Sequence, residues 1–257
     1  MEYVYCIVPD DNAFAAATGI GGAPVRRLRR EGGGISALVS SLSGDETNPD
    51  VVAARVGDAE WLAPHAIAHD ALITYAADQG DVIPLPMWVM FSDDAAVLGM
   101  LGERAREFET ALGAVRGARE FGVRVSADRA ALEAVADRIE GSIGALSEEA
   151  DAAPPGRAYL LRRRIAALRT SAVRDVAIRL AEDVHSRLSG LARASVSEAT
   201  ALAKEPGVVL DGAYLVQNAD YESFRAELTD IIGEYEPSGV RFEFTGPWPP
   251  YRFIREH

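Results

Sequence analysis

The chain has 257 residues, of which 48% are hydrophobic and 25% charged, an ordinary balance for a folded protein of one large or two small domains. Its net charge of −13 disfavours nucleic acid and anionic membrane surfaces as partners, because both require a basic surface. No apolar run reaches the roughly 18 residues that a membrane span needs, and the N-terminus lacks a secretory signal, so we expect a cytoplasmic protein without a membrane partner.

The first expected element is a strand over residues 1–8, apolar on both faces and containing Cys6, the single cysteine. One cysteine rules out an intramolecular disulfide and fits a reducing compartment. We expect Cys6 to be a small core residue. A nucleophilic role would need a nearby histidine and a lowered pKa, and the sequence shows neither.

A glycine-rich stretch and a basic cluster follow. Residues 19–24 lack the Gly-Lys-Ser/Thr sequence of a phosphate-binding loop, so they are interpreted as a turn that uses positive φ angles. The basic cluster consists of Arg26, Arg27, Arg29 and Arg30. We interpret it as a solvated face with acidic neighbours, and a docking patch is the alternative.

The rest of the first half alternates strands and helices. Strands are expected at residues 35–40 and 82–85, and a helix should run from the Asn48-Pro49-Asp50 turn to about Ala77, with Pro64 marking a break or a new start. Ser92-Asp93-Asp94 has the composition of a helix N-terminus. A core-facing stripe at spacings of three or four follows it: Val97, Leu101, Ala105, Phe108, Leu112 and Val115.

The second half begins with a strand at residues 121–125. A helix should start at Ser126-Ala127-Asp128, and residues 148–156 are expected to form an acidic loop. The apolar face of this helix comprises Leu132, Val135, Ile139, Ile143 and Leu146.

The longest periodic stretch runs from about Gly156 to Ala194. A helix of ~35 residues would be ~50 Å long, which exceeds the diameter of a compact domain, so it must kink or project. On its apolar face, Leu168→Ala or Leu180→Ala should cost about 2–5 kcal/mol. On its charged face, Arg169→Ala or Arg179→Ala should cost less than about 0.5 kcal/mol. The apolar stripe is Leu161, Ile165, Leu168, Ala172, Val176, Leu180, Val184, Leu188 and Leu191.

The chain closes with a strand at residues 208–217, a helix after Asn218-Ala219-Asp220 and a strand at residues 240–244. Segregated, mixed elements favour an α+β fold with mixed sheets packed against helices. We predict two domains with a boundary near residues 116–120: an N-terminal α+β domain at 1–118 and a C-terminal domain at 119–257. The second domain is interpreted as ferredoxin-like with a long helical insertion.

No set of residues converges on catalysis, a metal or a cofactor, so none of the three is predicted. His65 and His69 have the four-residue spacing of zinc ligands on a helix, but no third ligand can be assigned. His185 lies on the long helix and is the candidate for a haem or catalytic role. Paired carboxylates such as Asp93-Asp94 are adjacent in sequence and therefore do not share a helix face.

The C-terminal stretch at residues 246–253 combines three prolines with the aromatic residues Trp248, Tyr251 and Phe253. The prolines should prevent both a helix and the continuation of the preceding strand. One interpretation is a lid that covers the sheet. The other is a rigid recognition surface in which Trp248, Tyr251 and Phe253 bind a partner, since aromatic anchors are favoured at interfaces.

The run GPWPPYRF at residues 246–253, with the strand Ala213-Tyr214-Leu215-Val216 before it, resembles the C-terminal signature of the gas vesicle protein F/L family (GvpF/GvpL). Residues 3–8, 82–86 and 120–125 resemble further blocks of that family in the same order. One departure is Pro86-Met87-Trp88-Val89-Met90, where the family usually has a basic residue, an aromatic residue and a Gly-Thr pair. Any contact that this loop makes in the family is therefore in doubt here.

The resemblance implies a non-enzymatic accessory protein of gas vesicle assembly, associated with the vesicle. Its partners would be the very hydrophobic vesicle wall protein and other gas vesicle accessory proteins. The alternative is a ferredoxin-like α+β enzyme or a haem- or metal-binding protein that uses His185 or His65. A Soret band or stoichiometric zinc in the purified protein would favour that alternative.

Overall fold

The computed structural model describes residues 1–139, 142–197 and 207–254, without the side chains of residues 136–145 and 166–172. The chain divides into two compact units, Met1–Glu120 with Pro247–His257, and Phe121–Gly246. The C-terminal stretch, which the sequence assigned to the second domain, therefore groups with the first unit. Two domains that fold independently remain a prediction.

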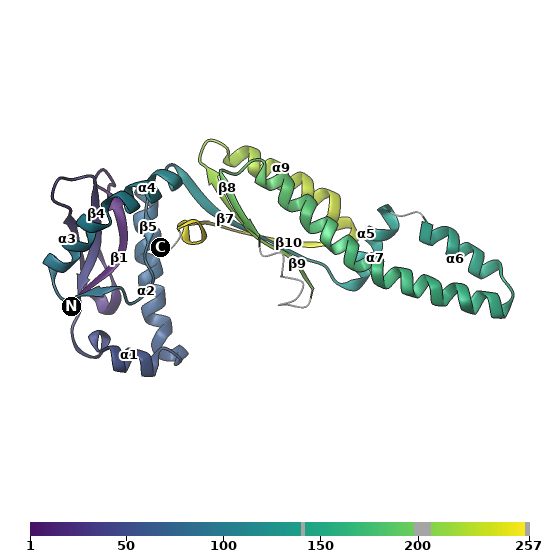
Figure 1. Cartoon of the computed structure of the whole chain (residues 1–257), viewed down its shortest axis with the longest axis horizontal. Coiled ribbons are helices and arrows are strands. Elements are labelled where there is room, and N and C mark those ends of the chain that lie inside the picture. Colours follow the sequence, from purple (N-terminus) through teal and green to yellow (C-terminus); the bar gives the residue numbers. More distant parts are fainter. Residues whose placement is uncertain (140–141, 198–206, 255–257) are drawn as a thin grey trace. The chain divides into compact units, whose positions relative to one another are not determined.

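The first unit is built on a six-stranded sheet in the order β2-β3-β4-β1-β5, with β6 also paired to β1 (Figure 1). The central strand β1 is buried on both faces, as its mostly apolar sequence predicts. It pairs antiparallel with β4 and β5. The strands are β1 Glu2–Pro9, β2 Ala17–Thr18, β3 Pro24–Arg29, β4 Ile35–Ser41, β5 Ile83–Pro84 and β6 Met90–Phe91.

A register shift in β1 decides which side chains face which layer. The pairing with β4 slips between Val4 and Cys6, so the alternation of faces changes phase there. Val4 and Ile7 pack in the core that contains residues of α3 and α4. Tyr3, Tyr5, Cys6 and Val8 pack in the core that contains residues of α2. Cys6 is thus the buried core residue that the sequence predicted.

Four helices complete the first unit: α1 (Pro49–Arg55), α2 (Ala59–Asp78), α3 (Asp94–Glu103) and α4 (Ala105–Val115). Asp93 caps α3 by accepting the backbone N–H of Ala96 at 2.9 Å. The predicted stripe from Val97 to Val115 is confirmed, since all six of its residues are buried. It is divided between two helices that meet at Arg104.

One expectation for the first half was wrong, and a strand was missed. Pro64 does not break the helix: α2 starts at Ala59, where the Asp58 carboxylate accepts the N–H of Glu60 at 3.0 Å and caps the helix. Three residues of the arginine cluster, Arg26, Arg27 and Arg29, lie in a strand, β3, that was not predicted. Acidic neighbours do surround it, because Arg26 pairs with Glu2 and Asp94, at 2.7 and 2.5 Å.

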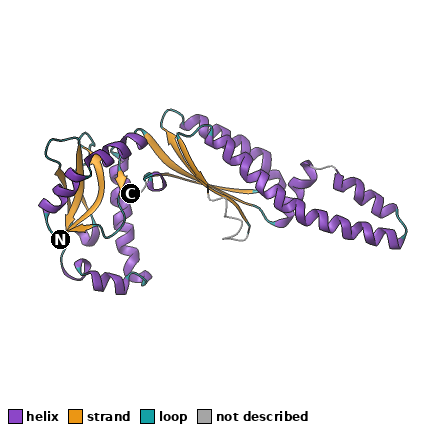
Figure 2. Ribbon diagram, in the orientation of Figure 1, coloured by secondary structure: helices purple, strands orange, loops and turns teal. Residues whose placement is uncertain are grey.

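The second unit contains a four-stranded sheet in the order β10-β7-β9-β8, with β8 antiparallel to β9 (Figure 2). Its core joins the sheet to α5, α7 and α9 through residues such as Val125, Leu180, Tyr214 and Phe224. The elements are β7 Ala118–Ser126, α5 Arg129–Ile139, α6 Ser142–Ala152, α7 Pro155–Ser189, β8 Ala194–Ser197, β9 Val208–Gln217, α9 Tyr221–Tyr235 and β10 Arg241–Trp248.

The α+β class and the long helix are confirmed. Val176, Leu180, Val184 and Leu188 on α7 are all buried, while four further predicted core residues (Ile139, Ile143, Leu168 and Ala172) and the charged Arg169 lie outside the described side chains. The acidic loop expected at residues 148–156 is wrong in part, because α6 extends to Ala152. The ferredoxin-like interpretation stays a prediction.

The last strand differs from its prediction in length. Val240 is buried, and Phe242 packs against the core of the unit. However, β10 continues through Pro247 to Trp248. β10 lies at the edge of the sheet, where a missing backbone N–H costs no ladder hydrogen bond, so proline is tolerated. Residues Tyr251–Phe253 then form a 3-10 turn.

Gly212 in β9 provides a test of packing in the second unit. A Cβ atom at this position would lie 2.7 Å from the hydroxyl oxygen of the fully buried Tyr214. We expect Gly212→Ala to lower the free energy of unfolding by about 1–3 kcal/mol, because the tyrosine ring must move within a packed core. Urea unfolding followed by circular dichroism measures the change.

Gly233 in α9 is the matched control for this substitution, because a Cβ there meets no atom within 4 Å. Gly233→Ala should stabilise the protein by up to about 1 kcal/mol through helix propensity. Destabilisation by both substitutions to a similar degree would contradict the packing described around Tyr214.

Candidate functional site

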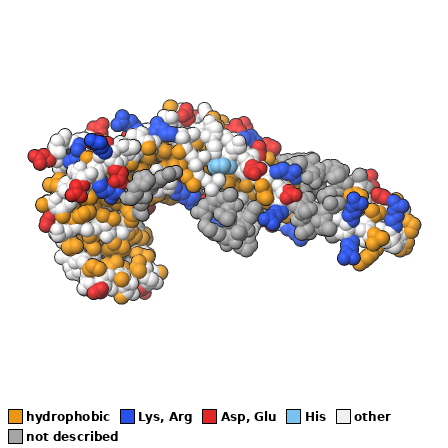
Figure 3. Space-filling view, viewed as in Figure 1, with side chains coloured by type: hydrophobic (Ala, Val, Ile, Leu, Met, Phe, Trp, Pro, Cys, Tyr) orange, Lys and Arg blue, Asp and Glu red, His pale blue; other side chains and the backbone are white. Residues whose placement is uncertain are grey.

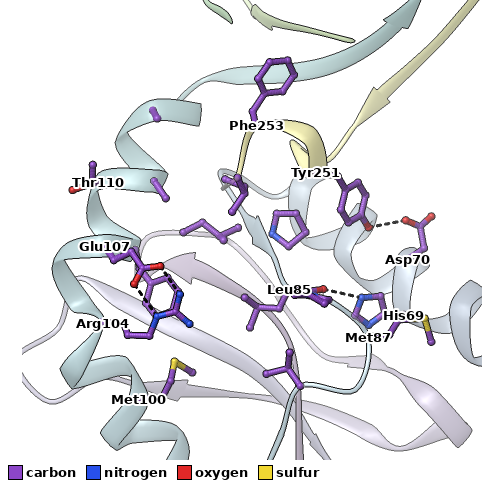
Figure 4. Close-up of a pocket in the computed structure, with 18 of the residues that line it drawn as sticks. His69, Asp70, Leu85, Met87, Met100, Arg104, Glu107, Thr110, Tyr251 and Phe253 are labelled. Atoms are coloured by element: carbon purple, nitrogen blue, oxygen red, sulfur yellow. Dashed lines mark hydrogen bonds and ion pairs between the residues drawn. The ribbon is translucent and has the colours of Figure 1, made fainter. Parts of the chain in front are cut away.

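The first unit contains an apolar groove of about 1180 Å³ (Figure 4). Its walls come from α2, the segment from β5 to β6, α3, α4 and the C-terminal stretch. The apolar lining includes Ile83, Leu85, Met87, Val89, Phe91, Met100, Phe108 and Ala111. A groove of this size and character fits an apolar ligand or an apolar segment of a partner better than a polar substrate.

His69 of α2 fixes one wall of the groove. Its Nε2 lies 3.2 Å from the carbonyl oxygen of Leu85, which can only accept, so Nε2 carries the proton. Its Nδ1 therefore accepts the hydrogen bond of the Tyr3 hydroxyl, at 2.8 Å. Burial lowers the pKa of His69, which keeps the ring neutral. This chain of hydrogen bonds ties α2 and β1 to the segment that lines the groove.

The segment after β5 is held in an unusual conformation at Trp88. Trp88 has φ +69°, a left-handed value that costs a large side chain of the order of 1–3 kcal/mol. Its N–H donates to the Tyr3 hydroxyl at 3.2 Å, and its ring stacks on Trp61 at a centroid distance of 5.5 Å. These contacts thus hold Trp88 within the segment that lines the groove.

The C-terminal stretch closes the groove on another side. The Tyr251 hydroxyl donates to the Asp70 carboxylate of α2 at 2.7 Å. The N–H of Arg252 donates to the Glu120 carboxylate at 2.9 Å. Tyr251 and Phe253 both line the groove, with Phe253 at its margin (Figure 4).

Of the three predicted partner-binding residues, Trp248 lies apart from this lining. Its side chain is 42% exposed in β10. Pro249 and Pro250, which follow it, are buried and carry the chain to the turn at Tyr251. The structure therefore brings Tyr251 and Phe253 together at the groove and leaves Trp248 as an exposed aromatic residue beside them in sequence.

One polar margin of the groove lies on α4, apart from the polar groups of His69, Asp70 and Tyr251. Arg104 pairs with Glu107 through Nε at 2.8 Å and through a second, shorter contact. The guanidinium carbon of Arg104 also lies 4.9 Å from the ring centroid of Phe108. Because the charge of Arg104 is paired within the protein, this margin favours no charged ligand strongly.

The histidines considered for metal binding are engaged elsewhere. His65 Nδ1 lies 2.7 Å from the carbonyl oxygen of Trp61, and both ring nitrogens of His69 have partners. In the second unit, His185 Nδ1 lies 3.1 Å from the Tyr214 hydroxyl. Over the described parts of the chain, no group of three metal-ligating side chains converges.

The Glu120 carboxyl, which holds Arg252, predicts a pH dependence. Burial raises its pKa, and the N–H and charge of Arg252 lower it less. The parent protein should therefore gain stability from Glu120 as pH falls through the pKa of the folded state. Glu120→Gln keeps an acceptor for Arg252 without the charge, so we expect it to stabilise the protein at neutral pH.

The Tm difference between Glu120→Gln and the parent should shrink towards zero on acidification, because the parent carboxyl then becomes neutral as well. Thermal melts of both proteins across the acid range measure this. A difference that does not vary with pH would show that Glu120 ionisation does not strain this site.

Sequence reasoning missed most of this groove. Asp70 and Tyr251 are 181 residues apart, and no periodic signal links them. Met100 is an apolar residue of α3 that lies outside the predicted core-facing stripe. That position was the signal in the sequence that could have pointed to this groove.

The family model described as gas vesicle synthesis protein GvpL/GvpF matches residues 2–255. Gas vesicle protein L of Streptomyces sp. (strain CB03234) is 36% identical, over 98% of this chain and 92% of its own length. Gas vesicle protein L2 of Halobacterium salinarum is 27% identical, over 98% of this chain and 90% of its own.

Two solved structures share the fold. The crystal structure of GvpF from Anabaena sp. PCC7120 matches with a TM-score of 0.70 at 15% identity, covering 100% of this chain and 96% of that one. That of GvpF from Microcystis aeruginosa matches with a TM-score of 0.68 at 16% identity, covering 99% of each chain. In the described part of this chain, no helix is both long and apolar enough to span a membrane.

Proposed function

Because this chain belongs to the gas vesicle GvpL/GvpF family, we propose that it is an accessory protein of gas vesicle assembly that binds an apolar segment of the vesicle wall protein in the groove of its first unit. A wall subunit that exposes apolar surface before it assembles needs a partner to cover that surface. The observation that carries the proposal is the groove itself, about 1180 Å³ in volume and predominantly apolar.

The proposed contact residues are Tyr251 and Phe253 at the groove and the exposed Trp248 before them. Aromatic side chains on a turn fixed by buried prolines lose little conformational freedom on binding. Tyr251 is anchored to Asp70 through its hydroxyl, so its ring is already oriented in the free protein. We propose that these three residues anchor the wall protein.

We further propose that the protein acts in the cytoplasm, associates with the vesicle and contacts other gas vesicle accessory proteins. The single cysteine, buried and unpaired, suits a reducing compartment. The absence of enzymatic activity and of a cofactor stays a prediction.

The test is the amount of wall protein that co-purifies with tagged variants. Tyr251→Ala removes a groove-lining ring whose residue is 38% exposed, so it should reduce the captured wall protein several-fold while the Tm changes little. Tyr251→Phe keeps the ring and loses only the hydrogen bond to Asp70, so it should retain most of the binding.

Trp248→Ala is the second arm of the same experiment. Its half-exposed ring predicts a stability cost below the ~3–5 kcal/mol of a fully buried aromatic residue. If binding falls only in proportion to the folded fraction in both alanine variants, the C-terminal stretch is a structural lid and the proposal fails for these residues.

A further inference from the structure

The first turns of α7 present a second candidate surface, in the other unit and independent of the groove. Leu161 and Ile165 of α7 pack with Leu146 and Ala150 of α6, so one face of α7 is covered. Tyr159 and Leu160 turn away from this contact and are 66% and 64% exposed. Such exposure of two adjacent large apolar side chains on a rigid helix is typical of an interaction site.

Arginine side chains lie beside these two residues. Positions 159, 160, 163 and 164 fall within one face of the helix, because residues three or four apart are neighbours on a helix surface. Arg163 and Arg164 are exposed, and among the residues that the structure describes neither has an ion-pair partner. Figure 3 shows blue and orange side chains side by side at the end of this helical hairpin.

Two other arginines near these residues, Arg157 and Arg162, form ion pairs within the protein. Arg157 pairs with Glu149 at 2.6 Å, and Arg162 pairs with Asp151 at 3.3 Å, both across to α6. The intramolecular acids thus satisfy the arginines that face α6. Among the described residues, the two that flank Tyr159 and Leu160 have no acidic partner, although the chain as a whole carries a net charge of −13.

We propose that the face formed by Tyr159, Leu160, Arg163 and Arg164 binds an acidic amphipathic helix of another protein. The exposed rings and methyl groups would pack into the apolar stripe of that helix, as helix ridges pack into grooves. The guanidinium groups would bind carboxylates on either side of the stripe, a pairing that arginine makes bidentately. A patch of two helical turns is small, so the complex is transient.

An anionic lipid surface offers the same charge but fits less well. Each basic residue near such a surface contributes about 1 kcal/mol. Two arginines therefore supply little attraction against the repulsion of a chain with a net charge of −13.

The proposal is tested with the full-length protein and a fluorescent synthetic helix of leucine, alanine and glutamate whose leucines lie on one face. Fluorescence anisotropy should show saturable binding that weakens between 0.1 and 1 M salt, where the Debye length falls from about 10 to about 3 Å. Arg163→Glu with Arg164→Glu, or Tyr159→Ser with Leu160→Ser, should weaken binding at least tenfold.

Three controls separate this surface from others. Arg225→Glu, on the exposed face of α9, makes the same charge change elsewhere and should leave binding unchanged. Met100→Glu, in the groove of the first unit, should also leave peptide binding unchanged. Peptide binding at α7 is then independent of the function proposed for the groove. A peptide with lysine in place of every glutamate should not bind.

The proposal is overturned if the acidic and lysine peptides bind equally. It is also overturned if the two double variants bind the acidic peptide as the parent does. Binding to anionic phospholipid vesicles, without binding to the acidic peptide, would assign the face to a membrane and refute the helix.

Discussion

Leu180→Ala is expected to lower the free energy of unfolding by about 2–5 kcal/mol. Leu180 is 2% exposed and lies in the C-terminal third of α7, within the core that joins this helix to the sheet of the second unit. Truncation removes buried apolar area and leaves a cavity, and both terms destabilise the folded state. Urea denaturation followed by circular dichroism measures the change.

Arg174→Ala on the same helix is the control, since its side chain is exposed. It should change the free energy of unfolding by less than about 0.5 kcal/mol. Equal losses from the two substitutions would mean that the apolar and charged faces of α7 are assigned wrongly.

Helices with long apolar stripes could be predicted from sequence because their signal is local. The stripe from Val97 to Val115 and the one from Val176 to Leu188 repeat every three or four residues, and each is buried as expected. Helix starts could also be predicted from the sequence, as Asp93 shows. A capping side chain lies within three residues of the N–H that it binds.

Short strands and edge strands were harder to predict from the sequence. β3 carries three arginines and β8 has only four residues, so neither has the apolar alternation that identifies a strand. β10 includes Pro247, which is permitted only because the strand lies at the edge of its sheet. The position of a strand in a sheet depends on pairing partners far away in sequence.

Only part of the candidate site could be predicted, because it too depends on contacts between residues far apart in sequence. Tyr251 and Phe253 stood out as aromatic residues in a stiff, proline-rich stretch, and they line the groove. The sequence did not connect the opposite walls, from His69 and Asp70 to Met100, with these aromatic residues. Their proximity to the C-terminal stretch results from long-range contacts such as Tyr251 with Asp70.

The largest effect on function is expected from Met100→Glu, which places a carboxylate in the apolar groove. An apolar segment bound there would have to desolvate that charge without a partner, so wall-protein affinity should fall tenfold or more, about 1.4 kcal/mol. Met100 is only partly buried in the free protein, so the fold should tolerate the change.

Leu98→Glu is the matched control, because Leu98 lies on the same helix, is 36% exposed and does not line the groove. The decisive measurement is the amount of wall protein retained by each tagged variant on co-purification, with circular dichroism to verify folding. We predict that Met100→Glu loses the wall protein and Leu98→Glu retains it at the parent's level. Equal retention by the two folded variants would contradict binding in the groove.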